Sequence, residues 1–137
     1  MTSEGTRKLA ADANVILSAV IGKSALRVFT AGRFEIFTTR FNIDEVREYL
    51  PHLAAKYGLS TDVLLLQLSL LPLQVKDEKY YAGKMREARD LISSRDEDGA
   101  HLLALSLALK IPVWSNDRHF ANLPVPAYTT AQLLKHL

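Results

Sequence analysis

The sequence predicts an α/β fold in which a central, mainly parallel sheet of four or five strands carries helices on both faces. Two observations lead to this prediction. Short apolar runs typical of buried strands alternate along the chain with longer segments of helical hydrophobic spacing. Strands that are separated by helices usually pair in parallel, with both faces of the sheet covered. The length of 137 residues fits one domain, and we therefore expect a single domain over residues 1–137.

The first half of the chain is expected to contain two strands and four helices. Ser24 and Ser60 are suitable residues for the start of a helix, and Gly22, Gly32 and Gly58 follow helical patterns at the positions where helices commonly end. We expect, in order, a strand over 8–11, a helix over 14–21, a helix over 24–31, a strand over 34–38, a helix over 41–57 and a helix over 60–71.

The second half is expected to contain three strands and three helices. Pro72 and Pro112 each end a helical pattern, and Trp114 lies inside an apolar run, which favours packing in the core. We expect, in order, a strand over 73–75, an amphipathic helix over 77–93, a polar junction over 94–98, an apolar helix over 102–109, a strand over 113–115, a strand over 125–129 and a terminal helix over 131–137.

Composition excludes several classes of protein. A hydrophobic fraction of 48% excludes a disordered chain, and no stretch is long and apolar enough for a membrane helix. The absence of cysteine excludes disulfides, thiolate zinc sites and a cysteine nucleophile. The N-terminus lacks the order of charges and apolar residues found in signal peptides, which predicts a cytoplasmic protein. The net charge of +2 says little about partners.

Acidic residues occur where strands end or helices begin. Asp12 follows the first strand, Asp117 follows the strand over 113–115, and Glu45 lies near the start of the helix after the second strand. Asp96 and Asp98 precede the apolar helix. In a parallel sheet these ends share one edge, so the acids are expected to converge in one pocket. Several carboxylates cannot stay ionised together without a cation, and an oxygen-only set favours Mg²⁺ or Mn²⁺.

Each acid also has a simpler structural interpretation. Asp12 and Asp96 could be helix N-caps, Glu45 could be a first-turn acid that the helix dipole stabilises, and Asp117 could begin an Asx turn. Arg118 could contact a phosphate or lie in an exposed loop. The common edge of the sheet is the observation that favours a shared site.

Four segments together resemble the motifs of PIN-domain nucleases, in the same order along the chain. They are DANVILSA at 12–19, NIDEV at 42–46, RDED at 95–98 followed by LALSLAL at 103–109, and IPVWSNDRHF at 111–120. The resemblance implies a three-layer α/β/α fold and cleavage of RNA that depends on Mg²⁺ or Mn²⁺. Chains of this length in the family are commonly VapC-like toxins, which form homodimers and bind a small antitoxin protein that blocks the site.

The resemblance also implies roles for individual residues. Gly99 stands where related sequences often carry an acid, so the third acid is Asp96 or Asp98, of which Asp98 is preferred. The implied catalytic and metal-binding acids are Asp12, Glu45, Asp98 or Asp96, and Asp117. Asn14, Ser115 and Asn116 are the polar residues expected to support them, and Arg118 and His119 are candidates for contact with RNA.

The function predicted from the sequence is that of a metal-dependent endoribonuclease, the toxin of a toxin–antitoxin pair. The alternative is a non-catalytic PIN-like module that binds RNA or protein with a degenerate metal site, which Gly99 favours. A weaker alternative is a phosphatase or DNA nuclease that uses the same carboxylates and metal.

Overall fold

A five-stranded parallel sheet lies at the centre of the computed structural model, which describes residues 7–92 and 97–137. The spatial order of the strands is β3-β2-β1-β4-β5, and every pairing is parallel. The strands are β1 (Arg7–Ala11), β2 (Phe34–Thr39), β3 (Leu73–Lys76), β4 (Val113–Trp114) and β5 (Ala127–Tyr128). The predicted strand number and direction are therefore confirmed.

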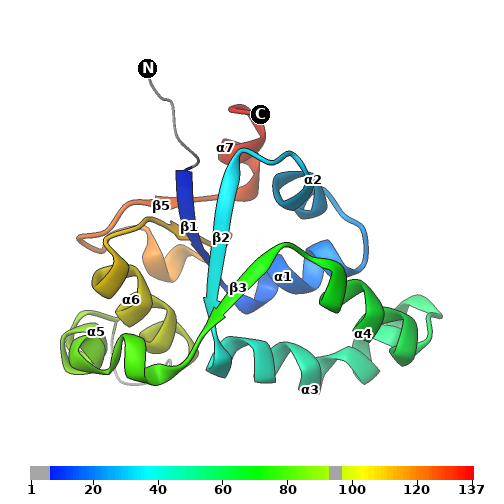
Figure 1. Ribbon diagram of the computed structural model, residues 1–137, viewed down its shortest axis with the longest axis horizontal. Helices are drawn as coiled ribbons and strands as arrows, with labels where there is room; N and C mark the ends of the chain where they lie inside the picture. Colours follow the sequence, from blue (N-terminus) through cyan, green and yellow to red (C-terminus); the bar gives the residue numbers. More distant parts are fainter. Residues whose placement is uncertain (1–6, 93–96) are drawn as a thin grey trace.

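Helices cover both faces of this sheet, which confirms the predicted α/β/α layering (Figure 1). The helices α5 and α6 lie on one side of the sheet, and α1, α2 and α4 lie on the other. The helices are α1 (Ala13–Val20), α2 (Ala25–Thr30), α3 (Arg40–Tyr57), α4 (Thr61–Leu70), α5 (Met85–Ile92), α6 (Glu97–Leu109) and α7 (Thr130–Leu134), with 3₁₀ turns η1 (Glu78–Tyr80), η2 (Ala82–Lys84) and η3 (Arg118–Phe120). No helix in the described part of the chain is long and apolar enough to cross a membrane.

Alternation of side chains along the strands divides the interior into two cores. Leu9 and Ala11 of β1 face the core that α1 to α4 and α7 share, whereas Ala10 faces the core under α5 and α6. In β4, Trp114 belongs to the first core and Val113 to the second. Successive residues of a strand point to opposite faces, so both faces of this sheet need an apolar cover. The predicted core position of Trp114 is confirmed by its complete burial.

Local capping fixes where the helices around the pocket begin and end. The Asp12 side chain accepts a hydrogen bond from the backbone N–H of Val15 and caps α1, and Thr39 caps α3 through the backbone N–H of Asn42. Gly58 ends α3 with a φ of 65°, a left-handed conformation that glycine adopts without steric cost. These caps place the starts of α1 and α3 directly after β1 and β2.

The segment predicted as one helix over 77–93 is interrupted, so this prediction was wrong. Two 3₁₀ turns precede α5, and the backbone of Tyr81 has a φ of −137°, outside the helical region. Tyr81 is only 2% exposed, and its hydroxyl lies 2.7 Å from Nδ1 of His101. Burial of this ring against α6 therefore prevails over a continuous helical ladder.

Smaller differences concern element ends. Of the predicted polar junction over 94–98, residues 97 and 98 already belong to α6, and the rest falls outside the described residues. The terminal helix ends at Leu134, and β5 has two residues where five were expected. The shortness of β4 and β5 limits the ladder between them to two residue pairs.

The hydrogen bond that joins β4 to α7 gives a test of the core. Trp114 Nε1 donates to Thr130 Oγ1 at 3.0 Å, and both residues are buried. We expect Thr130→Val to lower the free energy of unfolding by about 1–3 kcal/mol, because it leaves the indole N–H buried without an acceptor. Chemical denaturation followed by the fluorescence of Trp114, the single tryptophan of the sequence, measures this loss. An unchanged midpoint would contradict it.

Candidate active site

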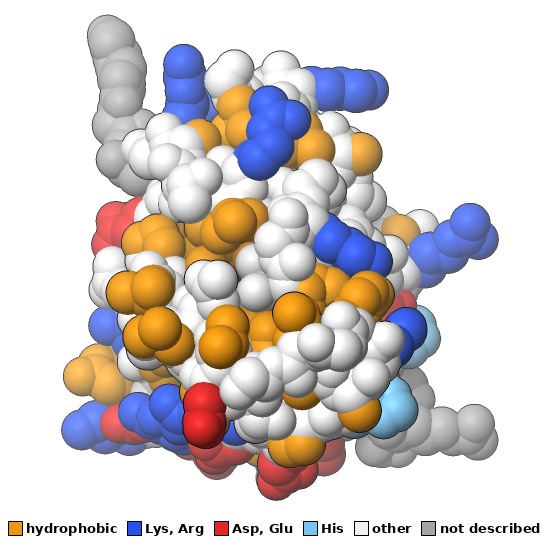
Figure 2. All heavy atoms as spheres, turned by 90° about the vertical axis from the view of Figure 1, so that its right-hand side faces the viewer, with side chains coloured by type: hydrophobic (Ala, Val, Ile, Leu, Met, Phe, Trp, Pro, Cys, Tyr) orange, Lys and Arg blue, Asp and Glu red, His pale blue; other side chains and the backbone are white. Residues whose placement is uncertain are grey.

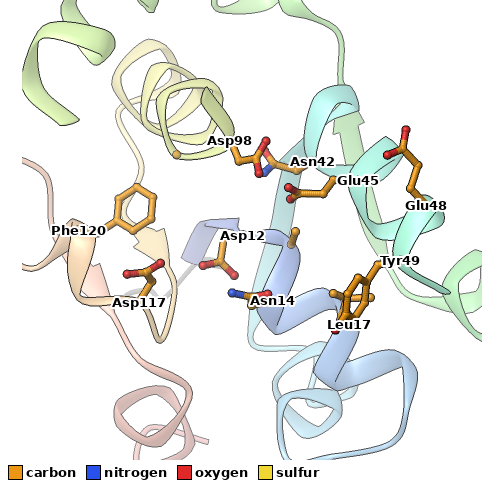
Figure 3. Close-up of a pocket in the computed structure, with 12 residues that line it drawn as sticks. Asp12, Asn14, Leu17, Asn42, Glu45, Glu48, Tyr49, Asp98, Asp117 and Phe120 are labelled. Atoms are coloured by element: carbon orange, nitrogen blue, oxygen red, sulfur yellow. The ribbon is translucent and has the colours of Figure 1, made fainter. Parts of the chain in front are cut away.

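A pocket of about 580 Å³ lies at the carboxyl edge of the sheet, where β1, β2 and β4 end. This is the point at which the strand order reverses: β2 and β3 lie on one side of β1, and β4 and β5 lie on the other. Open parallel sheets bind ligands at such reversals. The described residues that line the pocket are Asp12, Ala13, Asn14, Leu17, Asn42, Glu45, Glu48, Tyr49, Asp98, Gly99, Asp117 and Phe120 (Figure 3).

Four of the acids singled out in the sequence line this one pocket. Asp12 follows β1, Glu45 lies in α3, Asp98 lies in the first turn of α6 and Asp117 follows β4. Figure 3 shows these side chains entering the pocket from separate elements. The expected meeting of acids that are far apart in sequence is therefore observed. Their roles as metal ligands stay a prediction.

Ser115 connects Asp12 to Asp117. Its hydroxyl donates to Oδ2 of Asp12 and accepts a hydrogen bond from the backbone N–H of Asp117 at 2.9 Å. The other carboxylate oxygen of Asp12, Oδ1, accepts from the backbone N–H of Val15 at 3.0 Å. Asp12 is thereby held from the end of β4 on one side and from α1 on the other. The supporting role of Ser115 in a metal site stays a prediction.

Burial raises the pKa of the Asp12 carboxyl above its usual value of 3.8. The side chain is enclosed in a low-dielectric region, which disfavours the charged form. The hydrogen bonds from Ser115 and Val15 oppose this effect, whereas the charge of Asp117 adds to it. Charge is therefore costly at this position, and a bound cation would stabilise the ionised form.

The chemistry of the lining residues fits a hard divalent cation. All of the charged side chains that line the pocket in the described residues are carboxylates, and such oxygen ligands suit Mg²⁺ and Mn²⁺. Within residues 7–92 and 97–137, however, no three acidic or histidine side chains are gathered closely enough to hold a metal ion. An ion held by three or more of these side chains would require the carboxylates to move closer together, whereas Mg²⁺ often binds through one or two carboxylates and several waters.

The side chains of Asp98 and its neighbour Glu97 have different contacts. Asp98 lines the pocket together with Gly99, whereas Glu97 receives two hydrogen bonds from Arg89, at 2.9 Å and 3.0 Å. The preference for Asp98 as the third acid agrees with this placement. Asp96, the other candidate, lies outside the described residues.

The remaining predicted residues differ in their relation to the pocket. Asn14 lines it. The side chain of Asn116 is turned toward α7, where its Oδ1 accepts from the backbone N–H of Thr130 at 2.8 Å. Arg118 and His119 are exposed and are not among the lining residues, although Nδ1 of His119 lies 3.4 Å from Oδ2 of Asp117.

Besides Ala13 and Gly99, five lining residues were not predicted as site residues from the sequence, and helical spacing carries a signal for most of them. Asn42, Glu48 and Tyr49 stand three or four residues from Glu45, so they share its face of α3. Leu17 stands in the same relation to Asn14 on α1. Phe120, in the turn after β4, has no such signal.

The fold is shared with two solved structures. One is a toxin–antitoxin complex from Klebsiella pneumoniae, with a TM-score of 0.66 and 17% identity over 89% of this chain and 97% of the other. The second is VapBC2 from Rickettsia felis bound to a DNA fragment from its promoter, with a TM-score of 0.61 and 16% identity over 89% of this chain and 98% of the other. At these identities the similarity establishes the fold alone.

Sequence comparison identifies the family. No curated protein sequence matches the chain. A family model described as PIN domain matches residues 11–137, which begin at the end of β1 and include every acid of the pocket. The match covers nearly the whole chain and agrees with the fold, and the chain therefore belongs to the PIN-domain family.

Proposed function

We propose that this protein is a metal-dependent endoribonuclease that hydrolyses RNA phosphodiester bonds, and that it is the toxin of a toxin–antitoxin pair in the cytoplasm. In this proposal the carboxylates of Asp12, Glu45, Asp98 and Asp117 hold Mg²⁺ or Mn²⁺. Asp96 is a further candidate ligand.

The observation that carries the proposal is the meeting of four acids at the carboxyl edge of a PIN-domain sheet. The acids come from four separate elements and line one pocket. Carboxylates that line one pocket repel one another, and a bound cation relieves this repulsion. Such an arrangement is therefore better explained by a metal-dependent reaction than by structural stability.

A divalent ion would supply charge neutralisation for the phosphodiester and a nucleophilic water at neutral pH. The residues of the chain prepare its surroundings. Ser115 and Val15 hold both oxygens of Asp12 in place, and the backbone N–H of Asp117 fixes Ser115 in turn. Asn14, exposed at the start of α1, adds a polar group to the same pocket.

The proposal includes a small antitoxin protein and a second copy of the chain as partners. Support comes from the two similar structures, whose titles describe a toxin–antitoxin complex and a VapBC2 assembly. The α4 region exposes large apolar side chains, and hydrophobic groups gather on the face seen in Figure 2. The exposed apolar side chains in and just before α4 are Leu59, Val63, Leu65, Leu66 and Leu70. A surface of this kind is typical of protein contacts.

A second candidate is a non-catalytic PIN-like module that binds RNA or protein. It is favoured by Gly99 in the pocket lining and by the separation of the described acids, no three of which are gathered closely enough to hold an ion together. Measurement of cleavage and of metal binding on the same protein separates the two candidates.

We expect Asp98→Asn and Glu45→Gln each to reduce RNA cleavage roughly 100-fold or more, because each removes one ligand charge from the metal site. Labelled single-stranded RNA with Mn²⁺ or EDTA is the assay, and product ends are mapped. Cleavage by water leaves 5′-phosphate and 3′-hydroxyl ends. Products with 2′,3′-cyclic phosphate would contradict this mechanism.

The chain offers a matched control beside each of these acids. Glu97 is paired with Arg89, and Asp44 lies 4.0 Å from Arg47, so both are acids next to a pocket residue that do not line the pocket themselves. Glu97→Gln and Asp44→Asn should leave cleavage within about twofold of the wild type, as expected for surface acids. Equal losses in the controls would contradict the assignment of the site.

The raised pKa of Asp12 predicts how stability changes with pH in the metal-free protein. As the pH rises above 3.8, the unfolded chain releases this proton before the folded chain does, so the free energy of unfolding falls. Asp12→Asn removes this contribution. We therefore expect the variant to gain stability relative to the wild type as the pH rises above 3.8, while it loses cleavage. Denaturation at several pH values tests this, and a constant difference would contradict it.

A further inference from the structure

Asn42 is a buried polar residue in the first turn of α3 and lines the pocket between Glu45 and Asp98 (Figure 3). Its backbone N–H donates to Thr39 Oγ1 at 2.9 Å, and the Thr39 hydroxyl donates to Oδ1 of Asn42 at 2.6 Å. The carboxamide oxygen of Asn42 is therefore occupied by the hydroxyl of Thr39, the residue that caps α3. The orientation of the side chain is fixed by this pair of hydrogen bonds.

Other buried polar groups lie behind this pair. Thr39 is one of the groups that act on the pKa of the Tyr81 hydroxyl, and that hydroxyl lies 2.7 Å from Nδ1 of His101. Thr39, Tyr81 and His101 are all buried. Thr39 therefore holds the Asn42 oxygen in an enclosed part of the protein.

The other end of the Asn42 carboxamide is the amide nitrogen Nδ2, which carries two N–H groups. No described residue accepts a hydrogen bond from Nδ2, and the residue is 1% exposed. A buried donor without an acceptor destabilises the fold. An acceptor that enters the pocket would satisfy this donor.

The surroundings of Nδ2 indicate what kind of ligand this is. The described lining residues include five carboxylates and no lysine or arginine, so the pocket has many acceptors and few donors. An anionic ligand needs donors. A lysine here would repel a divalent cation, whereas a neutral amide donates to an anion without competing with the cation. Asn14 is also an amide, but it is exposed, which leaves Asn42 as the buried side-chain amide of the described lining.

We propose that Asn42 binds the substrate, donating from Nδ2 to a non-bridging phosphate oxygen of the nucleic acid that enters the pocket. The inference rests on the proposed nuclease function and adds a specific group to it. Thr39 is a positioning residue in this scheme, because it acts by holding the carboxamide oxygen.

The test compares two substitutions of similar size. Asn42→Asp keeps an oxygen that accepts from Thr39 but loses the donor, and Asn42→Leu loses both. We expect kcat/KM for single-stranded RNA in Mn²⁺ to fall roughly 10- to 100-fold in Asn42→Leu, the loss of one hydrogen bond to a charged group. Asn42→Asp should lose more, because its charge repels the phosphate.

Mn²⁺ binding, measured by titration without RNA, distinguishes a role of Asn42 in binding RNA from a role in maintaining the metal site. Asn42→Leu should bind Mn²⁺ as the wild type does, and Asn42→Asp should bind it equally well or more tightly, because a further carboxylate favours the cation. Weaker Mn²⁺ binding by Asn42→Leu would overturn the proposal, since Asn42 would then serve the metal site.

Thr130→Val is the matched control for lost stability, because it also breaks a buried side-chain hydrogen bond but lies outside the pocket lining. It should retain kcat/KM, whereas the Asn42 variants should not. Unchanged kcat/KM in both Asn42 variants would overturn this inference and leave the nuclease function standing. A wild type that binds Mn²⁺ and cleaves no RNA would overturn the nuclease function and, with it, this inference.

Discussion

Parallel pairing of β1 with β2 on one side and with β4 on the other is the constraint on which the pocket depends. Parallel strands end at one edge, so residues separated by a hundred positions in the chain are brought to the same place. Asp12 and Ser115 follow paired strands and form a hydrogen bond across them. An antiparallel β4 would place Ser115 at the opposite edge of the sheet.

The position of Asp12 has a cost in stability. Its carboxyl group is enclosed beside the charge of Asp117, and its pKa is raised as a result. Hydrogen bonds from Ser115 and Val15 offset part of the cost of burial. The capping role and the proposed metal-binding role of Asp12 are compatible, because a carboxylate has more lone pairs than these two donors use. The simpler interpretation of Asp12 as an N-cap is therefore confirmed, and it is compatible with the proposed metal-binding role.

The start of α3 combines a structural role with a proposed functional one. Thr39 caps the helix and, through the same hydroxyl, orients Asn42. Helical periodicity then brings Glu45 and Tyr49 to the same face. One short segment, beginning directly after β2, therefore supplies an amide, an acid and an aromatic ring to the pocket.

The sequence by itself determined the parallel α/β class, most element positions and the four acids of the pocket. Hydrophobic periodicity and the common edge of parallel strands are rules that apply to the chain as written, so Asp12 and Asp117 could be assigned to one site without coordinates. Only the tertiary structure decided that the helix predicted over 77–93 breaks at Tyr81, that Asn116 turns toward α7 and that Phe120 lines the pocket. Each of these depends on a partner from another element or on the shape of the assembled pocket, and local spacing carries no information about such contacts.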